Sequence, residues 1–224
     1  MKIAVASAVL LAGSSLCTGC AGTIHRSGER WPSKEQPIVV DRAQRTVRFA
    51  GIVPIVATSR PMLEVVVCTP DTREHEALVM TSVRPSHIHA ALLALGAEPG
   101  RPGGPVWNGR TFDMREPSGP SIGVRFAIDE QHPQWIDARE WFTIDPSSAL
   151  ETVWMFTGSW IHADRYAADA DGSIVGLVSF GTEVVGMAPA VTEIDAQRGF
   201  DFVAHPERVP PFGTRVVVEL RLLD

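Results

Sequence analysis

Residues 63–96, LEVVVCTPDTREHEALVMTSVRPSHIHAALLALG, decide the fold, because they place two strand-forming runs directly before one well-marked helix. The β-branched runs at residues 63–68 and 77–81 are bounded by turn-forming residues, which is typical of strands. Residues 86–95 are rich in helix formers, and Ser86 is the expected N-cap. Apolar residues recur along this helix at the spacing of one face. The segment therefore predicts a short helix that packs on a sheet.

Further β-branched runs continue along the rest of the chain. The polar residues 41–45 between two of them predict a hairpin, and residues 169–172, DADG, predict a turn between strands. The 17 prolines and 19 glycines also favour a loop-rich β architecture. We therefore expect an α+β fold, with a predominantly antiparallel β-sheet or sandwich and one short helix at about residues 86–95. The other expected strands are residues 38–40, 46–49, 123–128, 153–158, 174–180, 183–187 and 215–222.

The N-terminus has the order of a secretory signal, with a basic residue, an apolar run and then small residues. The run is shorter than the roughly 20 residues that a transmembrane helix needs. The stretch LCTGC at residues 16–20 resembles a bacterial lipobox, which predicts that Cys20 is acylated and becomes the new N-terminus. Ordinary signal-peptidase cleavage near Ala21 is the alternative. The expected segments are a signal peptide at residues 1–19, a lipid-anchored polar spacer at 20–36 and one domain at 37–224.

Export and composition predict the compartment and the partners. The anchor indicates an extracytoplasmic protein, on the periplasm-facing side of an outer membrane. The formal net charge is −6 and the arginines are scattered, so a nucleic-acid surface is not expected. Of the three cysteines, Cys17 leaves with the signal and Cys20 is acylated, which leaves Cys68 without a disulfide partner. The expected partners are the membrane, through the anchor, and a small ligand or an envelope protein.

The densest group of metal-binding side chains lies around the predicted helix. Cys68 ends a strand, His75 follows a turn, and His87 and His89 open the helix. Imidazole and thiolate are the usual ligands of zinc and copper, so these four residues are candidate metal ligands. Their spacing matches no closed metal site, because residues two apart on a helix lie about 200° apart around its axis. The alternative is that Cys68 is a small buried hydrophobe, that His75 faces solvent between two glutamates, and that His87 and His89 serve packing.

The same region predicts a site for a small ligand. Backbone amides at a helix start bind anions, and here they are flanked by Arg84 and Ser86. Glu74 and Glu76 add carboxylates on the preceding turn. These four residues are the candidate ligand-binding residues, and an ordinary capped helix end is the alternative.

Tryptophan side chains predict a second kind of interaction surface. Trp107, Trp135 and Trp141 stand among polar residues and are the expected surface residues. Trp154 lies in an apolar run and is expected in the core.

Several segments together resemble the YdjY-domain proteins. The most specific are EHE at residues 74–76 and PSHIHAALL at residues 85–93. The resemblance covers most of residues 37–223 and implies a secreted or lipid-anchored bacterial protein without an established activity. Some members carry a ferredoxin-like label, but an iron–sulfur cluster needs about four cysteine ligands and only Cys68 is available. The other matching positions are residues 63–70, 96, 156–159, 166–169, 172 and 180–182.

Three functions stay open on these observations. The first is an exported lipoprotein that binds a ligand or a metal ion at the EHE and PSHIH segments. The second is a hydrolase-like enzyme that uses the same histidines and glutamates as acid–base groups or zinc ligands. The third is a structural or partner-binding envelope module that works through exposed tryptophans.

Overall fold

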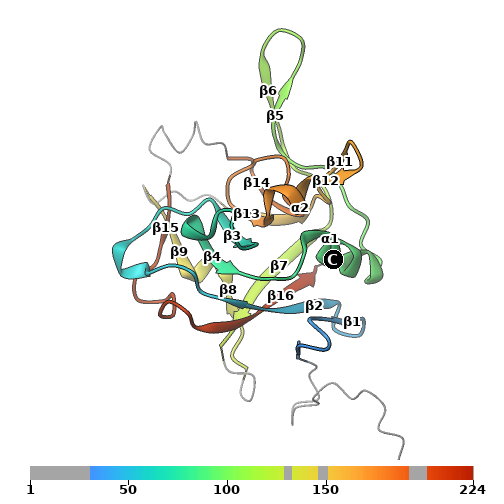
Figure 1. Ribbon diagram of the computed structural model, residues 1–224. Coiled ribbons are helices and arrows are strands. Elements are labelled where there is room, and N and C mark those ends of the chain that lie inside the picture. The colour runs from blue at the N-terminus through green and yellow to red at the C-terminus, as the bar shows by residue number, and fades with distance from the viewer. Residues whose placement is uncertain (1–30, 129–132, 146–150, 192–200, 224) are drawn as a thin grey trace, which may run out of the picture.

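One large sheet organises the computed structural model, which describes residues 31–128, 133–145, 151–191 and 201–223 (Figure 1). The strands of this sheet are β1 (Ile38–Asp41), β2 (Thr46–Ile52), β3 (Val65–Cys68), β4 (Ala77–Met80), β7 (Ser121–Ala127), β8 (Ile136–Asp137), β10 (Val153–Phe156), β13 (Ser173–Gly176), β14 (Val185–Ala188) and β16 (Arg215–Leu222). Three small sheets pair β5 (Gly104–Trp107) with β6 (Phe112–Arg115), β9 (Phe142–Asp145) with β15 (Asp201–Ala204), and β11 (Ile161–His162) with β12 (Arg165–Tyr166). The helices are α1 (Pro85–Ala94) and α2 (Ala167–Asp171), with 3₁₀ helices at Ala57–Ser59, Glu74–Glu76 and Ala138–Trp141.

The large sheet closes on itself. Its strand order is β1-β2-β16-β7-β10-β14-β13-β3-β4, and β4 pairs in turn with β2 through Met80 and Ile52. Strand β16 takes one whole edge of β2, so β1 and β4 share the other edge. Neighbouring strands are antiparallel except in the pairs β3–β4 and β13–β14, which are parallel. The expected α+β fold with a mostly antiparallel sheet is confirmed.

The closure between β2 and β4 depends on a residue without a side chain. A Cβ atom at Gly51 would lie 2.4 Å from Val79 Cγ1 and 3.0 Å from the Met80 carbonyl oxygen. Any larger residue would therefore push the two strands apart. Next to this point the Thr81 hydroxyl donates a 2.7 Å hydrogen bond to the Ala50 carbonyl, which ties the end of β4 to β2.

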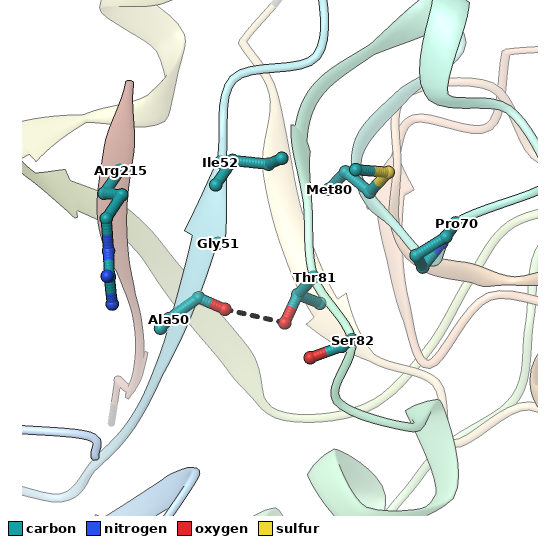
Figure 2. Close-up of a pocket in the computed structure, with 8 residues that line it drawn as sticks. All are labelled: Ala50, Gly51, Ile52, Pro70, Met80, Thr81, Ser82 and Arg215. Carbon is teal, nitrogen blue, oxygen red and sulfur yellow. Dashed lines mark hydrogen bonds between the residues drawn. The ribbon is translucent and has the colours of Figure 1, made fainter. Parts of the chain in front are cut away.

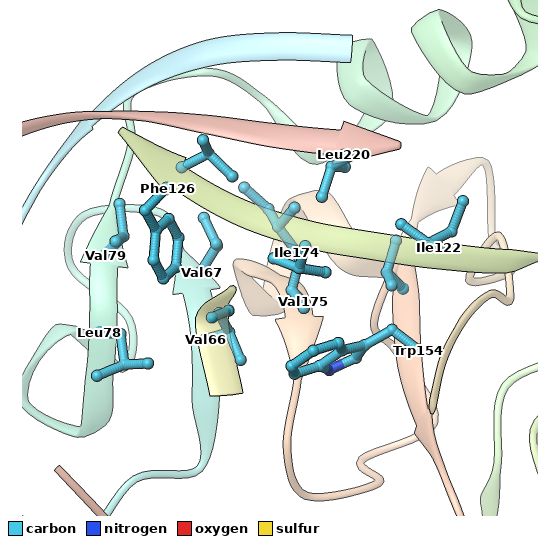
Figure 3. Packing of buried hydrophobic residues seen from close by; sticks show 14 of the residues in the cluster. Val66, Val67, Leu78, Val79, Ile122, Phe126, Trp154, Ile174, Val175 and Leu220 are labelled. Carbon is cyan, nitrogen blue, oxygen red and sulfur yellow. The ribbon is translucent and has the colours of Figure 1, made fainter. Parts of the chain in front are cut away.

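The core is formed by side chains that point into the interior of the closed sheet (Figure 3). Val66, Phe126 and Trp154 come from three different strands and are each at most 2% exposed. The burial of Trp154 confirms its expected place in the core. Helix α1 contributes Ile88 and Leu92, which are fully buried, so the apolar face expected from the sequence packs on the sheet. Each such side chain contributes about 1.5–3 kcal/mol by leaving water.

A buried ion pair stabilises the face of β16 that points away from this core. In the strand register, Glu219 lies between Arg48 of β2 and Arg125 of β7. Arg48 Nε is 2.8 Å from Glu219 Oε2, and Arg125 pairs with the other carboxylate oxygen. Trp135 lies over both guanidinium groups and stacks on Trp31, with 5.6 Å between the ring centroids. Trp31 is therefore part of the packed domain, ahead of the domain's expected start.

Two local predictions about the helices are wrong. Ser86 is not the N-cap of α1, because the helix begins at Pro85, whose fixed φ suits the first helical position, and Arg84 precedes it in extended conformation. The expected turn at residues 169–172 is instead the end of α2 with its C-cap, Gly172, whose φ of 81° glycine adopts without strain. Ser86 thus lies inside the first turn of α1, where it faces α2.

Candidate functional site

The start of α1 is bound by a carboxylate of the protein itself. Ser86 donates its backbone N–H to Asp169 Oδ1 at 2.8 Å and its hydroxyl to Asp169 Oδ2 at 2.7 Å. Arg84 Nε lies 3.7 Å from the second of these oxygens. A negative group here is stabilised by the partial positive charge of the helix N-terminus. The anion that the sequence predicts at Ser86 is therefore supplied by α2.

His89 is fixed by a second set of contacts, one turn further along α1. Its Nδ1 lies 2.8 Å from the Tyr166 hydroxyl, which donates to the Gly158 carbonyl at 2.9 Å. Because the phenol has a single proton, His89 Nδ1 is the donor in the first of these bonds. Burial lowers the pKa of His89, which keeps the imidazole neutral. Burial also raises the pKa of Tyr166, so its hydroxyl stays protonated.

These two sets of contacts form the wall of one hollow, which we call the α1–α2 hollow. Its volume is about 460 Å³. Arg84, before α1, and Arg165, at the end of the β11–β12 hairpin, both line it. The remaining lining residues are Asp164, Tyr166, Asp169 and Ala170. Segments that are far apart in the sequence, and that carry the family resemblance, thus converge around this hollow.

The other end of α2 holds a second polar network. Asp171 accepts hydrogen bonds from Arg73 Nη1 and from the Thr182 hydroxyl, both at 2.8 Å. Burial raises the pKa of Asp171, but these bonds and one from Ser173 outweigh burial, and the pKa lies below its ordinary value. The Arg73 guanidinium also lies over the Phe180 ring, 4.0 Å from its centroid. This network ties the turn before the EHE segment to α2.

The candidate metal ligands do not come together. The His75 side chain is 72% exposed on its 3₁₀ turn, where its partner is the neighbouring Glu76 at 3.7 Å. His87 is exposed, and His89 is held by Tyr166. Cys68 is fully buried, and burial raises the pKa of its thiol to about 11. In the part of the chain that the structure describes, no group of three or more His, Cys, Asp or Glu side chains is arranged to hold a metal ion.

The candidate ligand-binding residues divide between two places. Arg84 lines the α1–α2 hollow, and Ser86 fixes its wall through Asp169. Glu74 instead serves its own turn, because its carboxylate accepts the Thr72 N–H at 2.9 Å. Its own backbone amide and that of Thr72 lower the pKa of Glu74. Glu74 and Glu76 are not among the residues that line the hollow.

A second cavity, of about 310 Å³, lies at the seam where β2 and β4 meet (Figure 2). Its lining combines apolar side chains, such as Ile52 and Met80, with Arg215 and Ser82 at the edge. Figure 2 shows the Thr81 hydroxyl bonded to Ala50 across the seam, so this polar group is already used. None of the candidate metal-binding or ligand-binding residues predicted from the sequence lines this cavity.

The three tryptophans expected at the surface differ in their surroundings. Trp107 is 57% exposed on β5, which confirms the prediction. Trp135 is partly buried in its stack on Trp31. For Trp141 the prediction is wrong, because the 3₁₀ helix at Ala138–Trp141 turns its ring into the core, 4.4 Å from the Phe126 ring centroid, and leaves it 0% exposed.

Comparison with known proteins identifies one family. The model of the YdjY domain matches residues 38–221. The chain belongs to the YdjY domain family. No curated protein and no solved structure matches the chain. Among the described residues, no helix combines the length and apolarity of a membrane span.

The candidate site residues that the sequence did not predict lie on one stretch. Tyr166 and Asp169 stand in the YAAD segment, which the YdjY resemblance had already marked. Arg165 directly precedes it, and Asp171 lies in the DADG segment that had been assigned to a turn. The sequence shows that these residues are polar. It does not show that they contact α1 and the segment before β4, because only the folded chain brings these elements together.

A fully buried carboxyl group, Glu183, lies beside the Asp171 network. Its Oε2 accepts the Thr182 N–H at 3.0 Å, and its Oε1 has no hydrogen-bond partner among the described residues. A Cβ atom at Gly186 would lie 3.1 Å from this oxygen, so glycine makes room for the carboxyl group. Burial raises the pKa of Glu183 to about 7.

The substitution Glu183→Gln should remove a pH dependence of stability. The pKa of Glu183 is about 7 in the folded chain against an ordinary 4.5, so the folded state keeps its proton over that range. The protonated Glu183 therefore contributes to the free energy of unfolding, fully below about pH 4.5, and this contribution is lost as the pH rises through about 7. The free energy of unfolding changes by about 3 kcal/mol between these two limits. Urea unfolding of the wild type should therefore give a lower free energy at about pH 8 than at about pH 5, and the variant should lose this difference. Glu98→Gln, in an exposed loop, is the control, and an unchanged pH dependence in Glu183→Gln would contradict the assignment.

Proposed function

We propose that this chain is an exported, lipid-anchored protein whose domain binds a small anionic ligand, a carboxylate or a phosphate, in the α1–α2 hollow. The observation that carries the proposal is that Arg84 and Arg165 line the same hollow although they lie far apart in the sequence. Guanidinium groups suit carboxylates and phosphates because they offer parallel N–H donors. A volume of about 460 Å³ is within the range of small-molecule sites.

The wall of the hollow is held in place independently of any ligand. Asp169 is fixed by the amide and hydroxyl of Ser86, and Tyr166 by its bonds to Gly158 and His89. The Asp169 carboxylate interacts with both the start of α1 and the Arg84 guanidinium, so it neutralises only part of the positive charge that the two arginines and the helix start bring to the hollow. A wall that is already in place does not have to be ordered when a ligand binds, which favours affinity.

Ligand binding is favoured over acid–base catalysis by the position of His89. The neutral imidazole has the right protonation state for a general base, since burial lowers its pKa. Because Nδ1 donates to Tyr166, the basic lone pair is on Nε2, but His89 is not among the residues that line the hollow. A general base must reach the proton that it removes, which this arrangement does not support.

The proposed location depends on the N-terminal sequence. The LCTGC stretch at residues 16–20 supports acylation of Cys20, and the polar residues that follow it support a spacer. Strand β1, the first strand after the spacer, lies at the opposite end of the molecule from the β5–β6 hairpin (Figure 1).

Binding in the hollow is tested with citrate and inorganic phosphate as separate probes. At least one of them should raise the melting temperature of the wild type at constant ionic strength, because a ligand that binds the folded state stabilises it. The double variant Arg84→Gln/Arg165→Gln should lose at least about tenfold in affinity, measured by titration calorimetry. Arg110→Gln removes one positive charge at the exposed hairpin tip and should bind as the wild type does. No shift with either probe, or an equal loss in Arg110→Gln, would overturn the proposal.

Lipid anchoring is tested by labelling cells with palmitate. Cys20→Ser should abolish incorporation of the label and release the protein from the membrane fraction, because the modified sulfur is gone. Cys17→Ser is the matched control and should keep both. Incorporation that persists in Cys20→Ser would rule out this anchor.

A further inference from the structure

The β5–β6 hairpin is a ribbon of two strands that projects from the body of the protein (Figure 1). Its register pairs Trp107 with Phe112 and Gly104 with Arg115. Among the described residues no other strand extends this small sheet. A two-stranded ribbon is only marginally stable in water, so an additional strand would stabilise it.

One face of this hairpin is apolar. Directly opposed residues of an antiparallel pair share a face, and alternate residues of a strand do so too. Pro105, Trp107, Phe112 and Met114 therefore lie on one face, and they are all exposed, Phe112 at 68%. Exposed aromatic and Met side chains of this kind are typical of interfaces.

The two outer edges of the hairpin differ in what they offer. The Asn108 N–H donates to the Thr111 carbonyl at 3.0 Å, so these two residues form a hydrogen-bonded pair. Along an antiparallel ladder, hydrogen-bonded and non-hydrogen-bonded pairs alternate, so Trp107–Phe112 and Pro105–Met114 are non-hydrogen-bonded pairs. Phe112 and Met114 consequently direct their backbone N–H and C=O groups to the outer edge of β6. The corresponding outward position on β5 is Pro105, which has no N–H to donate. The edge of β6 is thus the one that can accept a further strand.

The side chains on β6 indicate which strand fits this edge. Asp113 and Arg115 lie on either side of Met114 and point to the polar face. Asp113 accepts from Asn108, and Arg115 donates its Nε to the Pro102 carbonyl. Among the described residues, the two terminal guanidinium nitrogens of Arg115 have no hydrogen-bond partner, so they are open to a second chain. A second β6 placed antiparallel about Met114 sets each Asp113 opposite the Arg115 of the other copy. Opposite charges in directly opposed positions stabilise a strand pair.

We infer that β6 pairs with β6 of a second copy of this chain, across a two-fold axis at Met114. The two Met114 residues then exchange backbone hydrogen bonds reciprocally, as an isologous interface requires. Both hairpins become one four-stranded sheet, and their apolar faces join into one surface. This assembly does not involve the α1–α2 hollow, so the dimer and ligand binding can be tested independently.

Sedimentation velocity of the purified mature protein at micromolar concentrations tests the pairing. The wild type should form a dimer, and Asp113→Arg and Arg115→Asp should each weaken it at least about tenfold, because each places like charges opposite one another twice. The double variant Asp113→Arg/Arg115→Asp should restore the dimer, since it re-creates both opposite-charge pairs in reversed order. Arg110→Asp changes the charge of the loop outside the register and should leave the dimer intact.

Three results would overturn the inference. They are a wild type that stays monomeric, a dimer that tolerates either single reversal, and a double variant that is as weak as the single ones. If a monomeric wild type sediments with phosphatidylglycerol vesicles and Trp107→Ser does not, the apolar face binds a membrane and not a second copy. Thermal melting of each variant checks that the domain remains folded.

Discussion

The pair of hydrogen bonds between Asp169 and Ser86 is the contact on which the α1–α2 hollow depends. It joins α2, which follows the β11–β12 hairpin, to the first turn of α1, and so brings Arg165 close to Arg84. Charge-assisted bonds to a helix start are stronger than neutral ones, and this one is largely shielded, because the Asp169 side chain is 18% exposed. Helix α1 is in turn fixed to the core, so the hollow is built on an element that the closed sheet holds in place.

Most of the fold could be predicted from local patterns, and the exceptions have physical causes. The runs that became β1, β2, β3, β4 and β16 were apolar and β-branched, which is a local signal. Helix α2 was missed because five residues are too few to show a helical period, and its DADG end has the composition of a turn. The hairpin formed by β5 and β6 was not predicted, because the prolines and glycines of residues 99–105, which lead into it, are typical of a loop. Closure through Gly51 depends on strands distant in the chain, and no local pattern encodes it.

The candidate site was predicted only in part, because local sequence patterns do not show which distant segments meet in the fold. Arg84 and Ser86 follow from the chemistry of a helix start, which the sequence displays, whereas His89 was expected as a metal ligand and instead contacts Tyr166. Their partners come from residues 158–169, and only the tertiary fold brings these beside α1. The metal hypothesis relied on proximity in sequence, but the Cys68 side chain points into an apolar cluster while His75 points to solvent. A ligand set has to converge in space, and these side chains do not.

Hydrogen exchange of the Ser86 amide, followed by NMR, tests the central claim most directly. Asp169→Asn keeps the size of the side chain and removes its charge, so exchange at Ser86 should become at least about tenfold faster. Asp164→Asn, which changes the other carboxylate of the hollow, should leave that rate unchanged. An unaltered rate in Asp169→Asn would mean that this carboxylate does not hold α1 and α2 together, and the account of the hollow would be wrong.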